Sequence, residues 1–77
     1  MEALLSIGET ARRGEVSVQT LRHYDRLGLL TPAAVTAAGY RLYSAGELQR
    51  LELIRTLREV GFGLETIRRL LHEKLEA

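Results

Sequence analysis

The pattern of apolar and polar positions predicts a short amphipathic helix that begins after Ser17 and ends before Gly28. Val18 and Leu21 lie three positions apart and face the same side, and Val16 adds an apolar anchor just before the helix. The Ser17 hydroxyl is suited to accept a hydrogen bond from a backbone N–H of the first turn. The helix therefore has one face for a core and one polar face.

A shorter helix is predicted upstream. Ser6 and Glu9 have the spacing of a capping box, and the helix that they start runs through Arg13. Residues 14–15, Gly-Glu, form the turn to the next helix. Two short helices joined by a tight turn, the second polar on its outer face, predict a helix-turn-helix. Residues 1–5 are expected to be a loose lead-in.

A β-hairpin is predicted after these helices. Pro32 stops any helix, because it lacks a backbone N–H and restricts the residue before it. Residues 30–31 and 40–43 are expected to form the strands, with Gly39 in the turn. An isolated hairpin is marginally stable, so this one must pack on the helices. The alternation leaves open which side is buried, that of Arg41 and Tyr43 or that of Tyr40 and Leu42.

Two further helices complete the predicted fold. A second capping box at residues 44–47 starts a long helix that runs to about Val60 and ends at Gly61. The last helix begins at Leu64, with Gly63 as its cap. The fold class is mainly α with a small β-hairpin wing, a single winged helix-turn-helix domain over residues 1–77. The apolar stripes of the two helices are Leu48, Leu51, Ile54 and Leu57, widened by Leu53 and Val60, and then Leu64, Ile67, Leu70 or Leu71, and Leu75.

Composition narrows the functional classes. Hydrophobic residues make up 45% and charged residues 27% of the chain, as in ordinary globular domains. The lack of cysteine excludes disulfides and thiolate metal sites. The sequence has neither a signal-peptide pattern nor a membrane-spanning apolar stretch, so a cytoplasmic location, without a membrane partner, is expected. The net charge is only +1, but every basic residue except Lys74 is an arginine, which suits planar contact with phosphates and guanine.

The sequence does not have the pattern of an enzyme or a metalloprotein. It lacks a nucleophile paired with a base, a plausible pair of catalytic carboxylates and a glycine loop for phosphates. His23 and His72 lie far apart and without nearby cysteine, which argues against a zinc site. No catalytic activity and no cofactor are expected.

The polar face of the helix after Ser17 carries the candidate functional chemistry. It combines amide, hydroxyl, guanidinium, imidazole and phenol groups, which suit the base edges and phosphates of a DNA groove. An ordinary solvated helix face is the alternative explanation. The residues of this face are Gln19, His23 and Arg26, with Thr20, Arg22 and Tyr24 on its flanks.

Five blocks of the sequence resemble, in order and spacing, the DNA-binding domain of MerR-family transcription regulators. The resemblance covers about Ile7 to Leu71, nearly the whole chain. The blocks are Ser6-Ile7-Gly8-Glu9, Val16-Ser17-Val18-Gln19-Thr20-Leu21-Arg22-His23-Tyr24-Asp25, Gly28-Leu29-Leu30, Gly39-Tyr40-Arg41-Leu42-Tyr43 and Leu57-Arg58-Glu59-Val60-Gly61-Phe62.

The resemblance implies a winged helix-turn-helix whose second helix enters the major groove of double-stranded DNA. Regulators of this family bind as homodimers to an inverted repeat within an over-long promoter spacer. They bend and untwist the spacer so that RNA polymerase can engage both promoter elements. Direction of regulation, operator and effector are not implied.

The resemblance also implies which residues contact DNA. They are Arg22, His23 and Tyr24 on the second helix, Arg41 on the wing and Arg58 near a second wing. Gln19 and Thr20 lie at the helix end that usually meets base edges. The alternative is that they are ordinary polar residues of the first helical turn. A salt bridge to Asp25 is the structural alternative for Arg22, and solvated charge is the alternative for Arg41 and Arg58. Arg12 and Tyr43 complete the expected contact set.

Three positions depart from the family pattern. Glu15 stands where glycine is usual, so Gly14 is expected to take over the permissive backbone role. His23 and Tyr24 replace a commoner pair of tyrosines, and Ala38 stands where asparagine often precedes the wing glycine.

The family continues into a long dimerisation helix and an effector-binding region, and this chain stops at Ala77. The isolated domain is therefore expected to be a monomer, with the homodimer belonging to the full-length protein. A stand-alone architectural DNA-binding protein of the excisionase type is the main alternative, and a protein-interaction module that keeps only the fold is a third.

Overall fold

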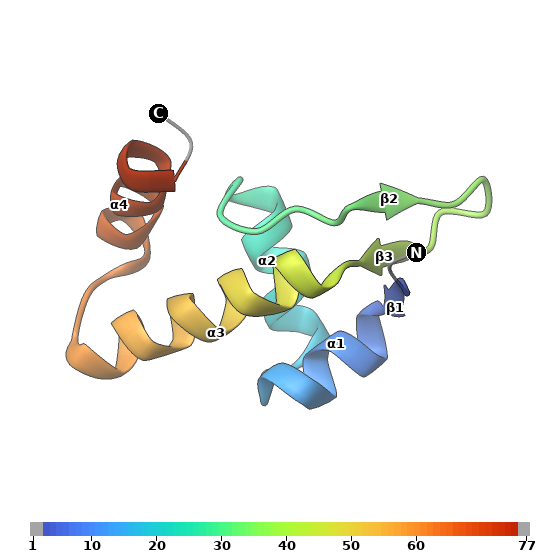
Figure 1. The fold of residues 1–77 in the computed structure, drawn as a ribbon, viewed down its shortest axis with the longest axis horizontal. Helices are drawn as coiled ribbons and strands as arrows, with labels where there is room; N and C mark the ends of the chain where they lie inside the picture. The colour runs from blue at the N-terminus through green and yellow to red at the C-terminus, as the bar shows by residue number, and fades with distance from the viewer. Residues whose placement is uncertain (1–2, 76–77) are drawn as a thin grey trace.

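The chain folds as a group of helices with a small sheet at one end, from which a hairpin projects (Figure 1). The computed structural model describes residues 3–75. This confirms the predicted fold class, mainly α with a wing. Within the described residues, no helix has the length and apolar character needed to cross a membrane. The elements are β1 (Leu5–Ser6), α1 (Ile7–Gly14), α2 (Val18–Arg26), β2 (Ala34–Val35), β3 (Arg41–Tyr43), α3 (Ala45–Val60) and α4 (Leu64–Leu75).

The sheet is antiparallel in the order β1-β3-β2. Leu5 of β1 pairs with Tyr43 of β3, and Ala34 of β2 pairs with Leu42 on the other side. The expectation that residues 1–5 form a lead-in was therefore wrong for Leu5. Its pairing partner lies far along the chain, where local patterns give no signal. Strand β1, which pairs with β3, therefore anchors the wing to the start of α1.

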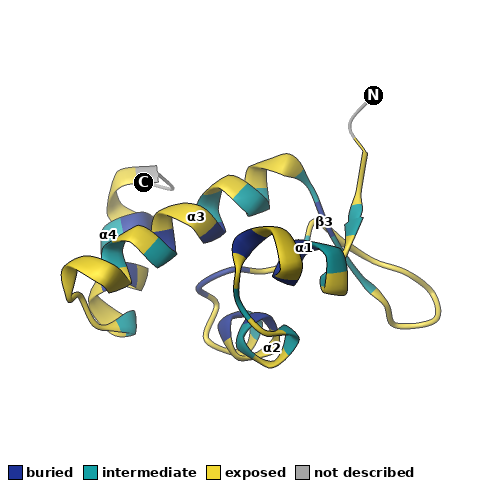
Figure 2. Cartoon of the chain, turned by 90° about the horizontal axis from the view of Figure 1, so that it is seen from below, coloured by how far each residue is buried: buried dark blue, intermediate teal, exposed yellow. Residues whose placement is uncertain are grey.

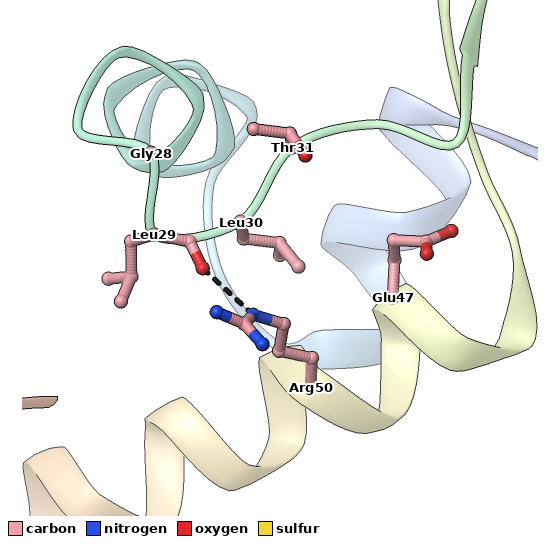
Figure 3. A pocket seen from close by; sticks show the side chains of 6 residues that line it. All are labelled: Gly28, Leu29, Leu30, Thr31, Glu47 and Arg50. Carbon is pink, nitrogen blue, oxygen red and sulfur yellow. Dashed lines mark hydrogen bonds between the residues drawn. The ribbon is translucent and has the colours of Figure 1, made fainter. Parts of the chain in front are cut away.

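The first strand of the wing was predicted too early, at residues 30–31 instead of Ala34–Val35. The backbone N–H groups of Leu29 and Leu30 donate to the Tyr24 carbonyl at 2.9 and 3.2 Å, and both side chains are buried. These two leucines thus end α2 and fill the core. Arg50 of α3 donates from Nε to the Leu29 carbonyl at 2.9 Å, beside a hollow of about 200 Å³ (Figure 3).

In the turn between α1 and α2, the prediction that Gly14 takes the permissive backbone conformation was wrong. Glu15 itself adopts the left-handed conformation, with φ 58°, and Gly14 is helical. A Cβ atom on Gly14 would lie 2.2 Å from Leu51 Cδ2, so glycine is needed there for close approach to α3. The carboxylate of Glu15 accepts a hydrogen bond from Arg55 of α3 at 2.9 Å, which also holds the turn against that helix.

Helix α3 is the central element of the core. Leu51 and Ile54 are fully buried, and Gly61 ends the helix in the left-handed conformation with φ 118°, as predicted. Leu53 and Val60 do not widen the apolar face, because both are exposed. At 100° per residue they lie off the stripe that Leu51 and Ile54 define. The buried hydrophobic residues of the whole domain are Ala11, Leu21, Tyr24, Leu29, Leu30, Tyr43, Leu51, Ile54, Ile67 and Leu71.

Substituting Gly14 tests the close approach of α1 and α3. Alanine normally stabilises a helix relative to glycine, but at this position its methyl group overlaps Leu51, which is fully buried and cannot move away freely. We expect Gly14→Ala to lower the free energy of unfolding by about 1–3 kcal/mol, measured by thermal or urea unfolding.

Gly8 in the same helix is the matched control. A Cβ atom there meets nothing closer than the Ser6 hydroxyl at 4.0 Å. Gly8→Ala should therefore raise stability by roughly 0.5–1 kcal/mol. Equal effects of the two substitutions would contradict the steric explanation.

Candidate nucleic-acid interface

Helix α2 is positioned by its caps and by one buried face. The Ser17 hydroxyl accepts a hydrogen bond from the Thr20 backbone N–H at 3.0 Å, which confirms the predicted N-cap. Leu21 is fully buried, and Val16 and Val18 pack against the core. Turning this face inward leaves the opposite face in solvent. The exposed residues of α2 are Gln19, Arg22, His23 and Arg26.

Helix α2, the loop of the wing and the connection from α3 to α4 lie on the same side of the molecule. Seen from below, α2 lies at the lower edge, between the loop of the wing and the connection from α3 to α4 (Figure 2). The loop of the wing and the connection are exposed, and α2 is exposed on one face. Arg58, in the last turn of α3 before that connection, is exposed as well. In this view α2, the wing and the end of α3 that carries Arg58 lie along one edge of the molecule (Figure 2).

Three of the predicted contact residues have polar partners within the domain, namely Thr20, Arg12 and Arg41. The Thr20 hydroxyl lies 2.9 Å from that of Ser17. Arg12 pairs with Glu9, which also accepts a hydrogen bond from Arg13 Nε at 2.7 Å. Hydrogen bonds from Arg13 and Arg12 lower the pKa of the Glu9 carboxyl. Arg12 is exposed, but its charge is shared with this acid.

Arg41 of the wing pairs with Asp25 of α2, at 2.8 Å between Nε and Oδ2. A salt bridge to Asp25 was the alternative to DNA contact for Arg22, and the structure pairs Asp25 with Arg41 instead. The ion pair spans 16 residues, so helical spacing gives no sign of it. Asp25, which is absent from the predicted contact set, thus connects α2 to the wing.

The two tyrosines of the predicted contact set are both buried. Tyr24 is 7% exposed, and its ring lies 6.4 Å from that of His23 between centroids. Tyr43 is 0% exposed, and among residues 3–75 its hydroxyl has no hydrogen-bond partner. Burial, and then the negative charge of Asp25, raise the pKa of the Tyr43 phenol, while Arg41 and Arg22 act in the opposite sense. Tyr43 therefore belongs to the core and has no surface for DNA.

The tip of the wing is exposed and uncharged. Tyr40 is 71% and Val35 58% exposed, and residues 27–40 contain no charged side chain. The backbone N–H of Thr36 donates to the Tyr40 carbonyl at 2.9 Å, which closes the hairpin. Tyr40 was assigned no role from the sequence, although its place directly after Gly39 marks a turn. The tip of the wing thus offers an aromatic ring and small apolar side chains, and the wing's arginine, Arg41, lies in β3.

A helix-turn-helix whose second helix is flanked by a sheet-borne wing defines the class of winged helix-turn-helix domains. The sequence profile described as "MerR HTH family regulatory protein" matches residues 5–74, and the chain belongs to this family.

Similar proteins agree with this assignment. The HTH-type transcriptional activator mta of Bacillus subtilis is 46% identical over 65 residues, which are 84% of this chain and 25% of that protein. A MerR-family transcriptional regulator from Bacillus cereus superposes with a TM-score of 0.87 at 35% identity, over 94% of this chain and 54% of that one. HiNmlR, a MerR family regulator lacking the sensor domain and bound to promoter DNA, superposes with a TM-score of 0.80 at 31% identity, over 88% and 54%.

These relatives are longer than the chain described here. It spans about a quarter of mta and about half of the two solved chains. The similar proteins bear the names of transcription regulators, which does not favour the excisionase-type alternative.

Substituting Tyr43 by phenylalanine tests its place in the core. Removing a buried hydroxyl that lacks a protein partner should stabilise the fold by about 1 kcal/mol. The melting temperature should then rise by roughly 4–8 °C for a domain of this size. DNA affinity, measured by anisotropy titration, should not change. A loss of affinity with the fold intact would return Tyr43 to the contact set.

Proposed function

We propose that this chain is the sequence-specific DNA-binding domain of a MerR-type transcriptional regulator. In this proposal α2 enters the major groove of an inverted-repeat promoter operator, and the domain helps to distort the spacer. The observation that carries the proposal is the single exposed face that unites the polar side of α2, the wing and the neighbourhood of Arg58. The promoter-bound relative HiNmlR, which shares the fold, supports it.

Each element of this face has a different task. The exposed side chains near the start of α2, Gln19 among them, are placed to meet base edges. Arg22 and Arg58 neutralise phosphates, and His23 adds a further hydrogen-bonding ring. Tyr24 has its ring in the core and meets a phosphate through its phenol, because a buried ring fixes where the hydroxyl points. Arg41 serves at the junction of α2 and the wing.

A grip on phosphates at both sides of α2 is suited to holding a strained duplex. Bending or untwisting DNA costs energy that depends on the sequence, and firm contacts with the backbone must offset this cost. Two domains related by a two-fold axis would grip both halves of an inverted repeat. We therefore propose that the longer protein acts as a homodimer, without catalysis and without a cofactor in this domain, in the bacterial cytoplasm.

Selection from random-sequence DNA, followed by salt titrations, tests this function. Enrichment of an inverted repeat with a wide spacer supplies the operator. Arg22→Ala should then weaken operator binding about 10- to 100-fold with the fold intact. Tyr24→Phe should weaken it roughly two- to tenfold through the lost hydroxyl. Unchanged affinity in both variants would contradict the proposed contacts, and a lack of any enriched sequence would contradict the function.

Arg69 provides the matched control. It is an exposed arginine on α4, at the end of the molecule opposite the wing (Figure 1). Arg69→Ala removes the same charge as Arg22→Ala but should leave operator affinity almost unchanged. Arg58→Ala, in contrast, should reduce the slope of log affinity against log salt by about 1.

The oligomeric state of the 77-residue chain is a separate prediction. Ile67 and Leu71, which lie in the apolar stripe of α4, are buried inside the domain, so they are not available to a second copy. We expect a monomer in sedimentation velocity runs without DNA. A tight dimer would show that another surface of the domain mediates self-association.

A further inference from the structure

The ion pair between Asp25 and Arg41 connects the recognition helix to the wing. Its nitrogen and oxygen lie 2.8 Å apart, and the side chains of Arg41 and Asp25 are 30% and 23% exposed. Partial burial weakens the screening of such a pair by water, so it holds its geometry better than a surface pair. The spacing between α2 and β3 is therefore fixed at this point.

Asp25 is an anion within a surface proposed to bind a polyanion. It is the only aspartate of the sequence and the only acidic residue of α2. It pairs with Arg41 of the wing, and its negative charge contributes to the raised pKa of the buried Tyr43 phenol. An acid at this place repels DNA phosphates in general. The presence of Asp25 is therefore not explained by a gain in DNA affinity.

Carboxylate and phosphate oxygens compete for the same donors of an arginine. Arginine has five N–H donors, and Asp25 engages the Nε edge of Arg41. A guanidinium held on one edge presents its remaining donors in a fixed direction, because the group is planar. DNA that places a backbone phosphate in front of these donors gains a contact without breaking the ion pair. DNA that places no phosphate there experiences only the repulsion of Asp25.

We propose that Asp25 is a positioning residue that sets the DNA specificity of this domain: it holds Arg41 at a constant spacing from α2 and disfavours DNA that does not fit that spacing. The inference rests on the proposed function and adds a residue to it. It predicts opposite effects of one substitution on cognate and on random DNA. A purely structural role would lower both affinities, and simple repulsion would lower neither.

Asp25→Asn is the decisive variant, because it removes the charge and keeps the shape. Affinity for the selected operator should fall about threefold, and affinity for a scrambled duplex of equal length should rise about threefold, so discrimination falls roughly tenfold. Both are measured by anisotropy titration at several salt concentrations. In an Arg41→Gln background, Asp25→Asn should no longer lower operator affinity.

Glu73→Gln is the matched control for net charge. Glu73 is exposed on α4, far from the wing (Figure 1), so its loss should leave discrimination unchanged. If Asp25→Asn fails to fold in a thermal scan, Asp25→Glu keeps the charge and displaces it. That variant should lower operator affinity and leave random-DNA affinity as it is.

The outcomes separate this inference from the function on which it rests. A wild-type domain that prefers no DNA sequence would overturn the proposed function. A wild-type domain that discriminates, with an Asp25→Asn variant that discriminates equally well, would overturn the role of Asp25 alone. Parallel loss of both affinities in a folded variant would do the same.

Discussion

The close approach of α1 to α3 at Gly14 is the constraint on which the rest of the structure depends. With no side chain at Gly14, the end of α1 rests directly on Leu51. The next residue, Glu15, must then turn in the left-handed conformation, which costs about 1–2 kcal/mol for a residue with a side chain. Its hydrogen bond with Arg55 offsets part of that cost. This turn sends α2 away at an angle that buries Leu21 and leaves the polar face outside.

The sequence is a good guide where a feature depends on neighbouring residues and a poor one where it depends on distant ones. The caps at Ser17 and Gly61 follow from local backbone chemistry, and both were predicted. The β1 strand and the Asp25–Arg41 pair depend on residues far apart in the chain, so neither was predicted. Residues 30–31 looked like a strand because buried leucines and strand residues have the same apolar character.

The distribution of charge explains how a domain with a net charge of only +1 can present a basic surface. Several acidic residues are paired with arginines away from α2, as Glu65 is with Arg68 on α4, where that arginine lowers the pKa of the carboxyl, whereas Asp25 of α2 is paired with Arg41. Within the described part of the chain, no ion pair involves Arg22, Arg26 or Arg58. Local pairing thus decides where positive potential remains, and the sum over the chain says little about it.

The uncharged tip of the wing, residues 35–40, would contribute to the proposed DNA binding by a different physical effect from that of the arginines. Contacts made by arginines release counterions from DNA and weaken steeply as salt rises. Apolar contacts by the exposed Tyr40 and Val35, if the proposed interface includes them, would release water instead and depend little on ionic strength. The share of the affinity that survives at high salt would then come from the tip of the wing.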